Sequence, residues 1–147
     1  MTPIRRLDHI AVLVRDTDAA LAFYRDRLGL SVHSSEVLET PPVRLTYLDA
    51  GNAYVQLVEP LAGASALEAW LREHGEGLHH ICFGVDDVPA AVRELSDPGS
   101  EVVLGSGRGR ISAFVRARDN GVPIECTEFR RDEDVEESAG WLAPAQR

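Results

Sequence analysis

The chain has 147 residues, of which 44% are hydrophobic and 27% are charged, and its formal net charge at pH 7 is −9. This length is sufficient for one domain with a proper hydrophobic core. The negative charge argues against a nucleic-acid backbone as partner, although a local arginine patch can still hold an anionic small molecule. No apolar run is long enough to span a bilayer, and the N-terminus has no hydrophobic signal core, so we expect a cytoplasmic protein without a membrane partner.

Two similar copies of one unit make up most of the chain. The segment LDHIAVLV, Leu7 to Val14, returns 71 residues later as LHHICFGV, Leu78 to Val85. A second pair of segments, AYVQLVEP and VPIECTEF, superposes Gln56 on Glu125. Two copies are too few for a solenoid, so we expect a pseudo-twofold duplication within a single domain at 1–131.

The first copy, about residues 6–60, predicts a strand, a helix and three further strands. Residues 7–14 predict a strand buried on both faces. Asp16 or Thr17 can cap the helix that follows, whose apolar positions run from Ala20 to Leu28, and Gly29 stops it. The remaining strands are predicted at 30–37, 43–48 and 53–58, with a hairpin turn at 49–52 between the last two.

A helix over 65–75 links the two copies. Ser65 and Glu68 form a capping box, Leu67, Trp70 and Leu71 give an apolar stripe, and Gly75 ends the helix. The second copy, about 77–129, begins at Gly77 with a strand that includes 78–85. A helix follows, and Asp87 matches Asp16 as its cap. Its last strands are predicted at 101–104, 111–115 and 122–128, with a hairpin turn at 119–121. We therefore predict an α+β fold of two tandem βαβββ modules.

The residues after Phe129 change in composition. The run RRDEDVEESAG cannot bury much apolar area, so 132–147 is predicted to be an acidic C-terminal tail that is mobile or loosely docked. Trp141 and Leu142 leave this open, because an aromatic residue near a terminus often packs against the domain.

Four polar residues occupy equivalent positions inside apolar strands. His9 and His80 lie on the first strand of each copy, and Gln56 and Glu125 lie on the last. Buried polar groups without partners cost roughly 1–3 kcal/mol each, so strands rarely keep several without a reason. Two imidazoles, an amide oxygen and a carboxylate suit a borderline or hard divalent cation, so we predict a metal site. The alternative is a pair of hydrogen-bonded core histidines and a surface carboxylate. His79 is a weaker candidate, since parity sends it to the opposite face.

Two further groups of residues have both a functional and an ordinary interpretation. Arg108 and Arg110, in the loop GSGRGR, form with Arg116 and Arg118 a basic cluster that can hold phosphates or carboxylates, or can simply be a solvated hairpin. Cys82 and Cys126 lack the spacing of a zinc knuckle or a redox pair, so we expect buried reduced thiols, although Cys82 shares the face of His80 and can offer a thiol ligand.

The stretches LDHIAVLVRDTDAALAFYRDRLGL and QLVEPLAGASALEAWLREHGEGLHHICFGVDDV carry a family resemblance. The chain resembles the vicinal oxygen chelate superfamily, which includes the glyoxalases, bleomycin resistance proteins and dioxygenases, and within it most closely the methylmalonyl-CoA epimerases. The resemblance covers about residues 6–129. It implies a cupped half-barrel fold, a homodimer, and His9, Gln56, His80 and Glu125 as ligands of a divalent metal such as Co, Zn, Mn, Ni, Fe or Mg.

The resemblance also implies a reaction. An epimerase removes the weakly acidic α-proton of an acyl-CoA thioester and returns a proton to the other face, while a divalent ion stabilises the enolate oxygen. Glu125, at the edge of the metal, is the implied acid/base residue. We therefore predict a metal-dependent isomerase that epimerises a 2-substituted acyl-CoA such as methylmalonyl-CoA.

The sequence departs from the epimerase pattern in two places. In some epimerases a Glu stands on the strand paired with the Gln strand, where pairing across the 49–52 turn here puts Leu45 opposite Gln56. Glu39 and Ser112 are the possible substitutes for that missing acid/base residue. The segment FVRARDNGVPIE also lacks the His-Pro-Lys run that usually follows the Phe. We expect Leu45, Ser112, Arg108 and Arg110 to contact the substrate.

These departures leave two alternatives open. One is another metal-dependent lyase, isomerase, hydrolase or dioxygenase of the same superfamily, because one fold hosts many chemistries. The other is a ligand-binding or resistance protein without turnover. Relatives of that kind usually have apolar residues in place of the ligands, so the retention of all four positions argues against it.

Overall fold

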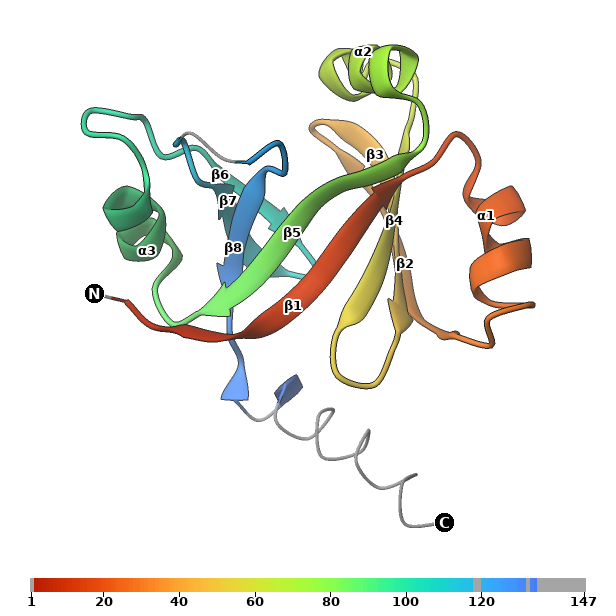
Figure 1. Cartoon of the computed structure of the whole chain (residues 1–147), viewed down its shortest axis with the longest axis horizontal. Helices are drawn as coiled ribbons and strands as arrows, with labels where there is room; N and C mark the ends of the chain where they lie inside the picture. Colours follow the sequence, from red (N-terminus) through yellow and green to blue (C-terminus); the bar gives the residue numbers. More distant parts are fainter. Residues whose placement is uncertain (1, 118–119, 132, 135–147) are drawn as a thin grey trace. The chain divides into compact units, whose positions relative to one another are not determined.

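The computed structural model describes residues 2–117, 120–131 and 133–134. Its elements follow the predicted order, a βαβββ module, a linking helix and a second βαβββ module (Figure 1). The first module comprises β1 (Ile4–Leu13), α1 (Thr17–Tyr24), β2 (Ser31–Glu39), β3 (Pro42–Asp49) and β4 (Tyr54–Pro60). After α2 (Ser65–His74), the second comprises β5 (Gly77–Val85), α3 (Val88–Leu95), β6 (Leu104–Gly107), β7 (Arg110–Phe114) and β8 (Ile124–Glu128). Most of the predicted acidic tail, with Trp141 and Leu142, lies outside the described residues, as does Arg118.

The repeat extends to the way in which α1 and α3 begin. The Asp16 carboxylate accepts a hydrogen bond from the backbone N–H of Ala19 at 3.1 Å, and the Asp87 carboxylate accepts one from Ala90 at 3.0 Å. Each aspartate satisfies a backbone donor that the first turn of a helix leaves without an intrahelical acceptor. Both predicted caps are therefore confirmed, with Asp16 rather than Thr17 as the cap of α1.

Two details of the helices differ from the prediction. Helix α1 ends at Tyr24, and a turn continues to Gly29, which has the expected positive φ of 80°. In α2 the capping box is wrong: Ala64 holds the N-cap position, so Ser65 is already inside the first turn. An alanine side chain has no hydrogen-bond acceptor, so no side chain caps the start of this helix.

Hydrogen bonds connect the strands in the order β2-β3-β4-β1-β5-β8-β7-β6. Within each module the consecutive hairpins β2–β3, β3–β4, β6–β7 and β7–β8 are antiparallel, whereas β5 pairs with β8 in parallel. The connection between β5 and β8, which contains α3 and two further strands, is long enough to permit this parallel pairing.

The chain divides into two compact units that do not coincide with the two sequence copies. Unit 1 contains the described residues of Met1–His9, Gly51–Ala53 and His80–Arg147, and unit 2 contains Ile10–Ala50 and Tyr54–His79. Strands β1 and β5 therefore each contribute to both units. The prediction of a single domain at 1–131 stays a prediction.

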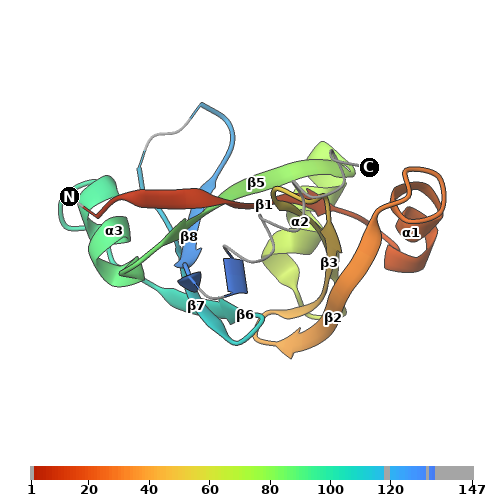
Figure 2. The ribbon, with the colours of Figure 1, turned by 90° about the horizontal axis from the view of Figure 1, so that it is seen from below.

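Each unit has its own hydrophobic core. In unit 1, α3 packs against β7 and β8 (Figure 2), and the buried cluster comprises Val85, Val88, Ala91, Val92, Ala113 and Cys126. In unit 2, alternate residues of β3 face opposite ways: Leu45 and Tyr47 join the cluster that contacts α2, and Leu48 joins the cluster that contacts α1. The alternation is the two-residue period expected of a strand with both faces covered.

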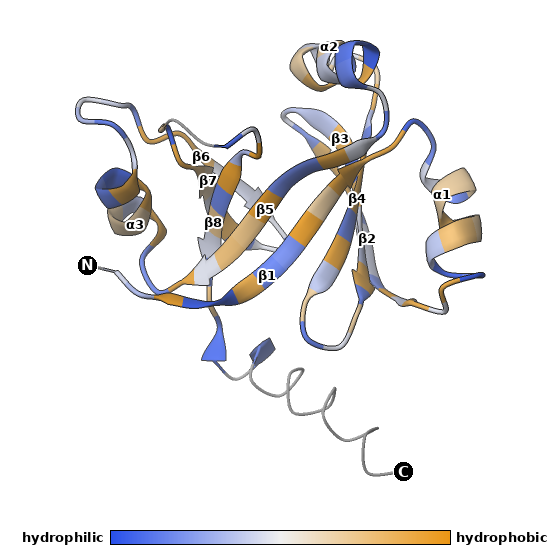
Figure 3. Cartoon of the chain, in the orientation of Figure 1, coloured by the Kyte–Doolittle hydropathy of each residue, from blue (hydrophilic) through white to orange (hydrophobic). Residues whose placement is uncertain are grey.

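Strand β1 is less apolar at its start than predicted. Figure 3 shows hydrophilic bands between hydrophobic ones along β1 and β5. Leu7 is 39% exposed, whereas Asp8 and His9, the next two residues, are buried. The prediction of burial on both faces is therefore wrong only at Leu7, and the polar side chains of Asp8 and His9 are buried on the two opposite faces. None of the described helices is long and apolar enough to cross a membrane.

Candidate metal centre

Three of the four predicted ligands lie together within unit 1. His9 is on β1, His80 on β5 and Glu125 on β8. One oxygen of Glu125, Oε1, lies 3.3 Å from His9 Nε2 and 3.2 Å from His80 Nε2. One donor atom from each residue can be chosen so that all three lie within 4.8 Å of one another. The two imidazole rings meet edge to face, with their centroids 5.5 Å apart.

Strand register places these side chains. Glu125 pairs with Cys82 across β5 and β8 and with Phe114 across β7 and β8. His80 lies two residues before Cys82, so the two share a face of β5. The Phe114 ring contacts the His80 imidazole edge to face at 5.0 Å, which limits the rotation of that imidazole. His9 and His80 are only 2% and 6% exposed.

The contacts among these groups favour an ionised Glu125 and a protonated His9. Burial alone would favour a neutral carboxyl, but hydrogen bonds from His80 and His9 lower the pKa of Glu125 below its ordinary value. For His9, burial opposes the charged imidazole, but hydrogen bonds to Asp8 and Glu125 raise its pKa. An ionised carboxylate is the form that binds a divalent cation, and it is also the form that can accept a proton.

The donor set suits a divalent metal. Two imidazole nitrogens and one carboxylate oxygen are borderline and hard ligands, which Zn, Fe, Co, Ni and Mn accept. Without a cation, two buried imidazoles would share a single carboxylate oxygen in a volume with little solvent. His9, His80 and Glu125 therefore fit the predicted metal by number, type and proximity, and their assignment as ligands stays a prediction.

Gln56, the predicted fourth ligand, belongs to unit 2. Its amide nitrogen donates a hydrogen bond to the Tyr47 hydroxyl at 2.7 Å, which fixes the amide orientation. The side chain is 4% exposed, and the carbonyl oxygen Oε1 has no hydrogen-bond partner among the described residues. A buried amide oxygen without a partner costs free energy, so this oxygen is suited to accept a ligand or a cation.

The strand register corrects the position predicted for Leu45. Tyr47, not Leu45, pairs with Gln56, and Leu45 pairs with Val58. The prediction paired Asp49 with Asn52 and left two residues between them, whereas the structure pairs Asp49 with Tyr54 and leaves four. Leu45 still shares the face of Gln56 by parity and is buried in the apolar cluster of unit 2. Its predicted contact with substrate stays a prediction.

Arg108 and Arg110 do not lie in an open loop. The segment GSGRGR is a tight hairpin: β6 continues to Gly107, which pairs with Arg110, and only Arg108 and Gly109 form the turn, both with positive φ. The Arg108 guanidinium donates to the Asp8 carboxylate. Arg110 donates to Asp134 at 2.9 Å. The interpretation as a solvated hairpin is therefore wrong for both side chains, which are 9% and 4% exposed, and the substrate contact stays a prediction.

The remaining candidate residues lie in different surroundings. Cys82 is fully buried, and burial raises the pKa of its thiol well above the ordinary range, so it stays protonated. His79 contacts the Trp70 ring of α2 edge to face at 4.8 Å, within unit 2. Ser112 is buried on β7, whereas Glu39 is exposed at the end of β2. Of the two substitutes for the missing acid/base residue, only Ser112 belongs to unit 1.

Asp8 belongs to the site although it was not among the residues predicted from the sequence. Its carboxylate lies 2.6 Å from His9 Nδ1 and is fully buried. Burial opposes ionisation, but the hydrogen bond with His9 and the charge of Arg108 lower the pKa of Asp8. A signal was present, because an acidic residue inside the strand LDHIAVLV requires a partner.

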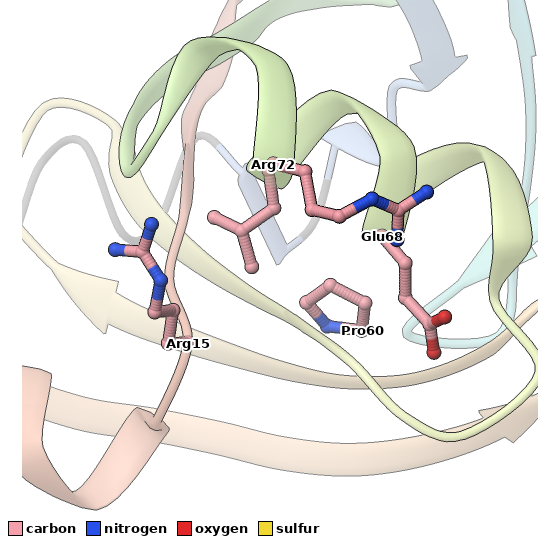
Figure 4. Close-up of a pocket in the computed structure, with 5 residues that line it drawn as sticks. Arg15, Pro60, Glu68 and Arg72 are labelled. Atoms are coloured by element: carbon pink, nitrogen blue, oxygen red, sulfur yellow. The ribbon is translucent and has the colours of Figure 1, made fainter.

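Unit 2 also contains a pocket with a volume of about 270 Å³ (Figure 4). It is lined by Arg15, Pro60, Glu68, Leu71 and Arg72. Arg15 also contacts Glu76, its backbone N–H donating to the carboxylate at 2.8 Å. None of the predicted site residues lines this pocket.

Comparison with known proteins identifies relatives over most of the chain. The chain is 32% identical to the uncharacterized protein YqjC of Bacillus subtilis, over 90% of this chain and 99% of YqjC. It is 35% identical to the ethylmalonyl-CoA/methylmalonyl-CoA epimerase of Cereibacter sphaeroides, over 83% of this chain and 96% of that enzyme. A solved structure of a methylmalonyl-CoA epimerase in complex with methylmalonyl-CoA and NH4+ is 36% identical, with a TM-score of 0.75 over 86% of this chain and 95% of that chain.

These similarities confirm the predicted fold class, an α+β fold of the vicinal oxygen chelate type. Residues 8–117, most of the chain, match the family described as the Glyoxalase/Bleomycin resistance protein/Dioxygenase superfamily. The chain belongs to this superfamily, and its relatives include methylmalonyl-CoA epimerases.

Proposed function

We propose that the protein is a divalent-metal-dependent epimerase of a 2-substituted acyl-CoA, similar in reaction to methylmalonyl-CoA epimerase. The observation that carries this proposal is the convergence of His9, His80 and Glu125, with donor atoms within 4.8 Å, in a chain 35% identical to such an enzyme. Gln56 is the proposed fourth ligand, since it holds on β4 the place that Glu125 holds on β8 and its Oε1 has no partner among the described residues.

Glu125 is the proposed acid/base residue. Its carboxylate is ionised because its pKa is lowered, so it can accept the α-proton of a thioester and later return one. A low pKa also makes it a weak base, so the reaction requires the thioester to be made more acidic. A bound divalent ion supplies this chemistry as a Lewis acid at the enolate oxygen.

The chain's other residues position these groups. The Phe114 ring holds the His80 imidazole, and the Tyr47 hydroxyl accepts a hydrogen bond from the Gln56 amide, so that Oε1 is the atom left to coordinate. The burial of both histidines excludes water, which strengthens electrostatic interactions in the site. Ser112 is the proposed second proton carrier, because it is buried on β7 in the same unit as Glu125.

The test is exchange of the α-proton. Methylmalonyl-CoA and ethylmalonyl-CoA are incubated with the protein in deuterated water, after chelation and reloading with Co, Zn, Mn, Ni, Fe or Mg in turn. We expect deuterium to enter the α-position with at least one metal, and exchange to stop in the chelated protein. If no metal raises exchange above the chelated control with either substrate, the epimerase proposal is wrong.

One observation favours a second candidate function. His9, His80 and Glu125, all within unit 1, are a two-histidine, one-carboxylate set, which is the set that binds Fe(II) in many oxygenases. The second candidate is therefore an Fe(II)-dependent dioxygenase, in which three protein ligands leave coordination positions for oxygen and substrate. Iron as the metal of the purified protein would favour this candidate, whereas loss of metal in a Gln56→Ala variant would favour the four-ligand epimerase.

A further inference from the structure

A fully buried carboxylate lies between the candidate metal centre and two arginines in unit 1. Asp8 Oδ2 is 2.6 Å from His9 Nδ1 and also accepts a hydrogen bond from Arg108 Nη2. The other oxygen, Oδ1, is 4.0 Å from Arg110 Nη1. The carboxylate therefore contacts one candidate ligand on one side and two cations on the other.

The contacts continue to the residues that follow β8. Arg110 donates to Asp134 at 2.9 Å and to Glu133 at 2.7 Å. Asp134 is 1% exposed, and its carboxylate also accepts the backbone N–H of Arg130 at 2.8 Å. Arg6, on β1, donates to the Asp134 backbone carbonyl at 2.9 Å. The contacts therefore run in series from Asp134 through Arg110 and Asp8 to His9. We call these four residues and Arg108 the Asp8 network.

The geometry at His9 determines which nitrogen can bind a cation. A carboxylate that accepts a hydrogen bond from Nδ1 holds the proton on that nitrogen, so Nε2 is the nitrogen that would give up its proton and bind a cation through its lone pair. Nε2 is the atom that lies 3.3 Å from Glu125 Oε1 in the candidate centre. Carboxylate partners of this kind orient metal-binding histidines and make them better donors.

The repeat shows that this carboxylate is not required by the fold. The position before His80 that corresponds to Asp8 is His79, which packs against Trp70 in unit 2. A βαβββ module therefore forms without an acidic residue at this place. Two arginines balance the buried charge of Asp8. Because a buried ion network often adds little net stability, its presence here favours a role in the site.

We propose that Asp8 is a positioning residue for the metal ligand His9, and that Arg108, Arg110 and Asp134 hold Asp8 in place. The residues after β8 then affect metal affinity although they do not contact the metal. This inference rests on the proposed metal site and adds to it the residues that set its affinity. It assigns the two arginines of the β6–β7 hairpin to the support of that site.

The first experiment compares Asp8→Asn with the matched control Asp86→Asn. Both aspartates lie in unit 1 and contact an arginine, but Asp86 is 53% exposed and pairs with Arg5 at 3.6 Å. The dissociation constant for Co(II) or Zn(II) is measured by competition with a chelator. We expect Asp8→Asn to weaken binding by about 10- to 100-fold, the effect typical of such carboxylate partners. Asp86→Asn should bind like the unsubstituted protein.

A spectrum separates positioning from general loosening of the fold. The visible absorption of bound Co(II) reports ligand geometry, so Asp8→Asn should change the absorption bands at saturating Co(II), and Asp86→Asn should not. An Asp8→Asn protein with the unsubstituted affinity and spectrum would overturn the proposal.

The second experiment tests the rest of the network. Asp134→Asn keeps the side-chain shape and removes the charge beside Arg110. It should weaken Co(II) binding by about 2- to 30-fold, the size of effect transmitted through intermediate residues. In the double variant the loss should be smaller than the product of the two single losses, because both changes act through the same carboxylate. An unchanged affinity in Asp134→Asn would overturn the part of the proposal that extends beyond Asp8.

Removing the Asp8 charge leaves two buried arginines, so the variant can fail to fold. In that case nitrogen NMR of the unsubstituted protein loaded with Zn(II) tests the proposal, because it shows which nitrogen of His9 carries a proton. We expect a proton on His9 Nδ1, and a proton on Nε2 would overturn the proposal. The failures are distinguishable: an unsubstituted protein that binds no divalent cation contradicts the metal site itself, whereas metal binding that is indifferent to Asp8 contradicts only this inference.

Discussion

Replacing Glu125 with Gln separates its two proposed roles, metal ligand and proton carrier. Glu125 Oε1 is the atom that both imidazoles approach, at 3.3 and 3.2 Å, and Gln keeps an oxygen at that place. The protein already has an amide donor of the same kind in Gln56. The metal should therefore largely remain, at a saturating metal concentration, while the ionised group is lost.

The expected effect on turnover follows from the worth of a positioned acid/base residue. Such groups contribute about 10²- to 10⁴-fold, so Glu125→Gln should raise the activation free energy by about 2.7–5.4 kcal/mol. The pKa of Glu125 lies below its ordinary value, so the residue is ionised at neutral pH, and the loss should be seen across the neutral range. The loss should appear in kcat, since the proton moves in the chemical step.

The assay is deuterium exchange into the acyl-CoA α-position, with metal content measured by elemental analysis. Glu128→Gln is the matched control, because Glu128 lies on the same strand as Glu125 but is not one of the three candidate ligands in unit 1. Its carboxylate instead accepts the backbone N–H of Ile111. Near-native exchange in Glu125→Gln with its metal bound would refute the reasoning. Glu125 would then be a ligand only, and the proton would have to be moved by another residue.

Three further predictions follow from other parts of the structure. His80→Ala should lose metal and activity together, measured by elemental analysis and exchange, and retention of full metal content would count against His80 as a ligand. Burial and the charge of Glu125 raise the pKa of Cys126 to about 11 from an ordinary 9.0, so the folded thiol stays protonated where the unfolded one ionises. The contribution of Cys126 to the stability of the metal-free protein should therefore fall as the pH rises from about 9, with a loss that approaches about 2.7 kcal/mol above pH 11, and chemical denaturation of Cys126→Ala should show a shallower fall. Asp16→Ala and Asp87→Ala should each lower the free energy of unfolding by about 1 kcal/mol, and a change in neither would contradict the observed caps.

The internal repeat explains why so much could be predicted from the sequence. A fixed offset of 71 residues aligns His9 with His80 and Asp16 with Asp87, and the structure has both histidines on equivalent strands and both aspartates as helix caps. Local patterns were sufficient here, because strand parity and helix capping depend on neighbours within a few residues.

The errors arose where the outcome depends on loop length or on distant partners. The sequence offers a plausible turn at 49–52, but the hairpin uses a longer loop, which shifts the partner of Gln56 from Leu45 to Tyr47. The arginines of GSGRGR have the composition of an exposed loop. Their burial depends on Asp8 and Asp134, which are distant in sequence, and no local pattern reveals such a pairing.

The boundaries of unit 1 have a consequence for how the donor group assembles. Since His9 arrives with the first strand and His80 and Glu125 with the second copy, neither sequence copy contains the three donors by itself. A chain cut in the loop between β4 and α2 would leave His9 on one fragment and the other two on its complement. Metal affinity would then report whether the fragments had reassociated. For the same reason, an ancestral half-length chain could have built this donor group only by pairing with another copy.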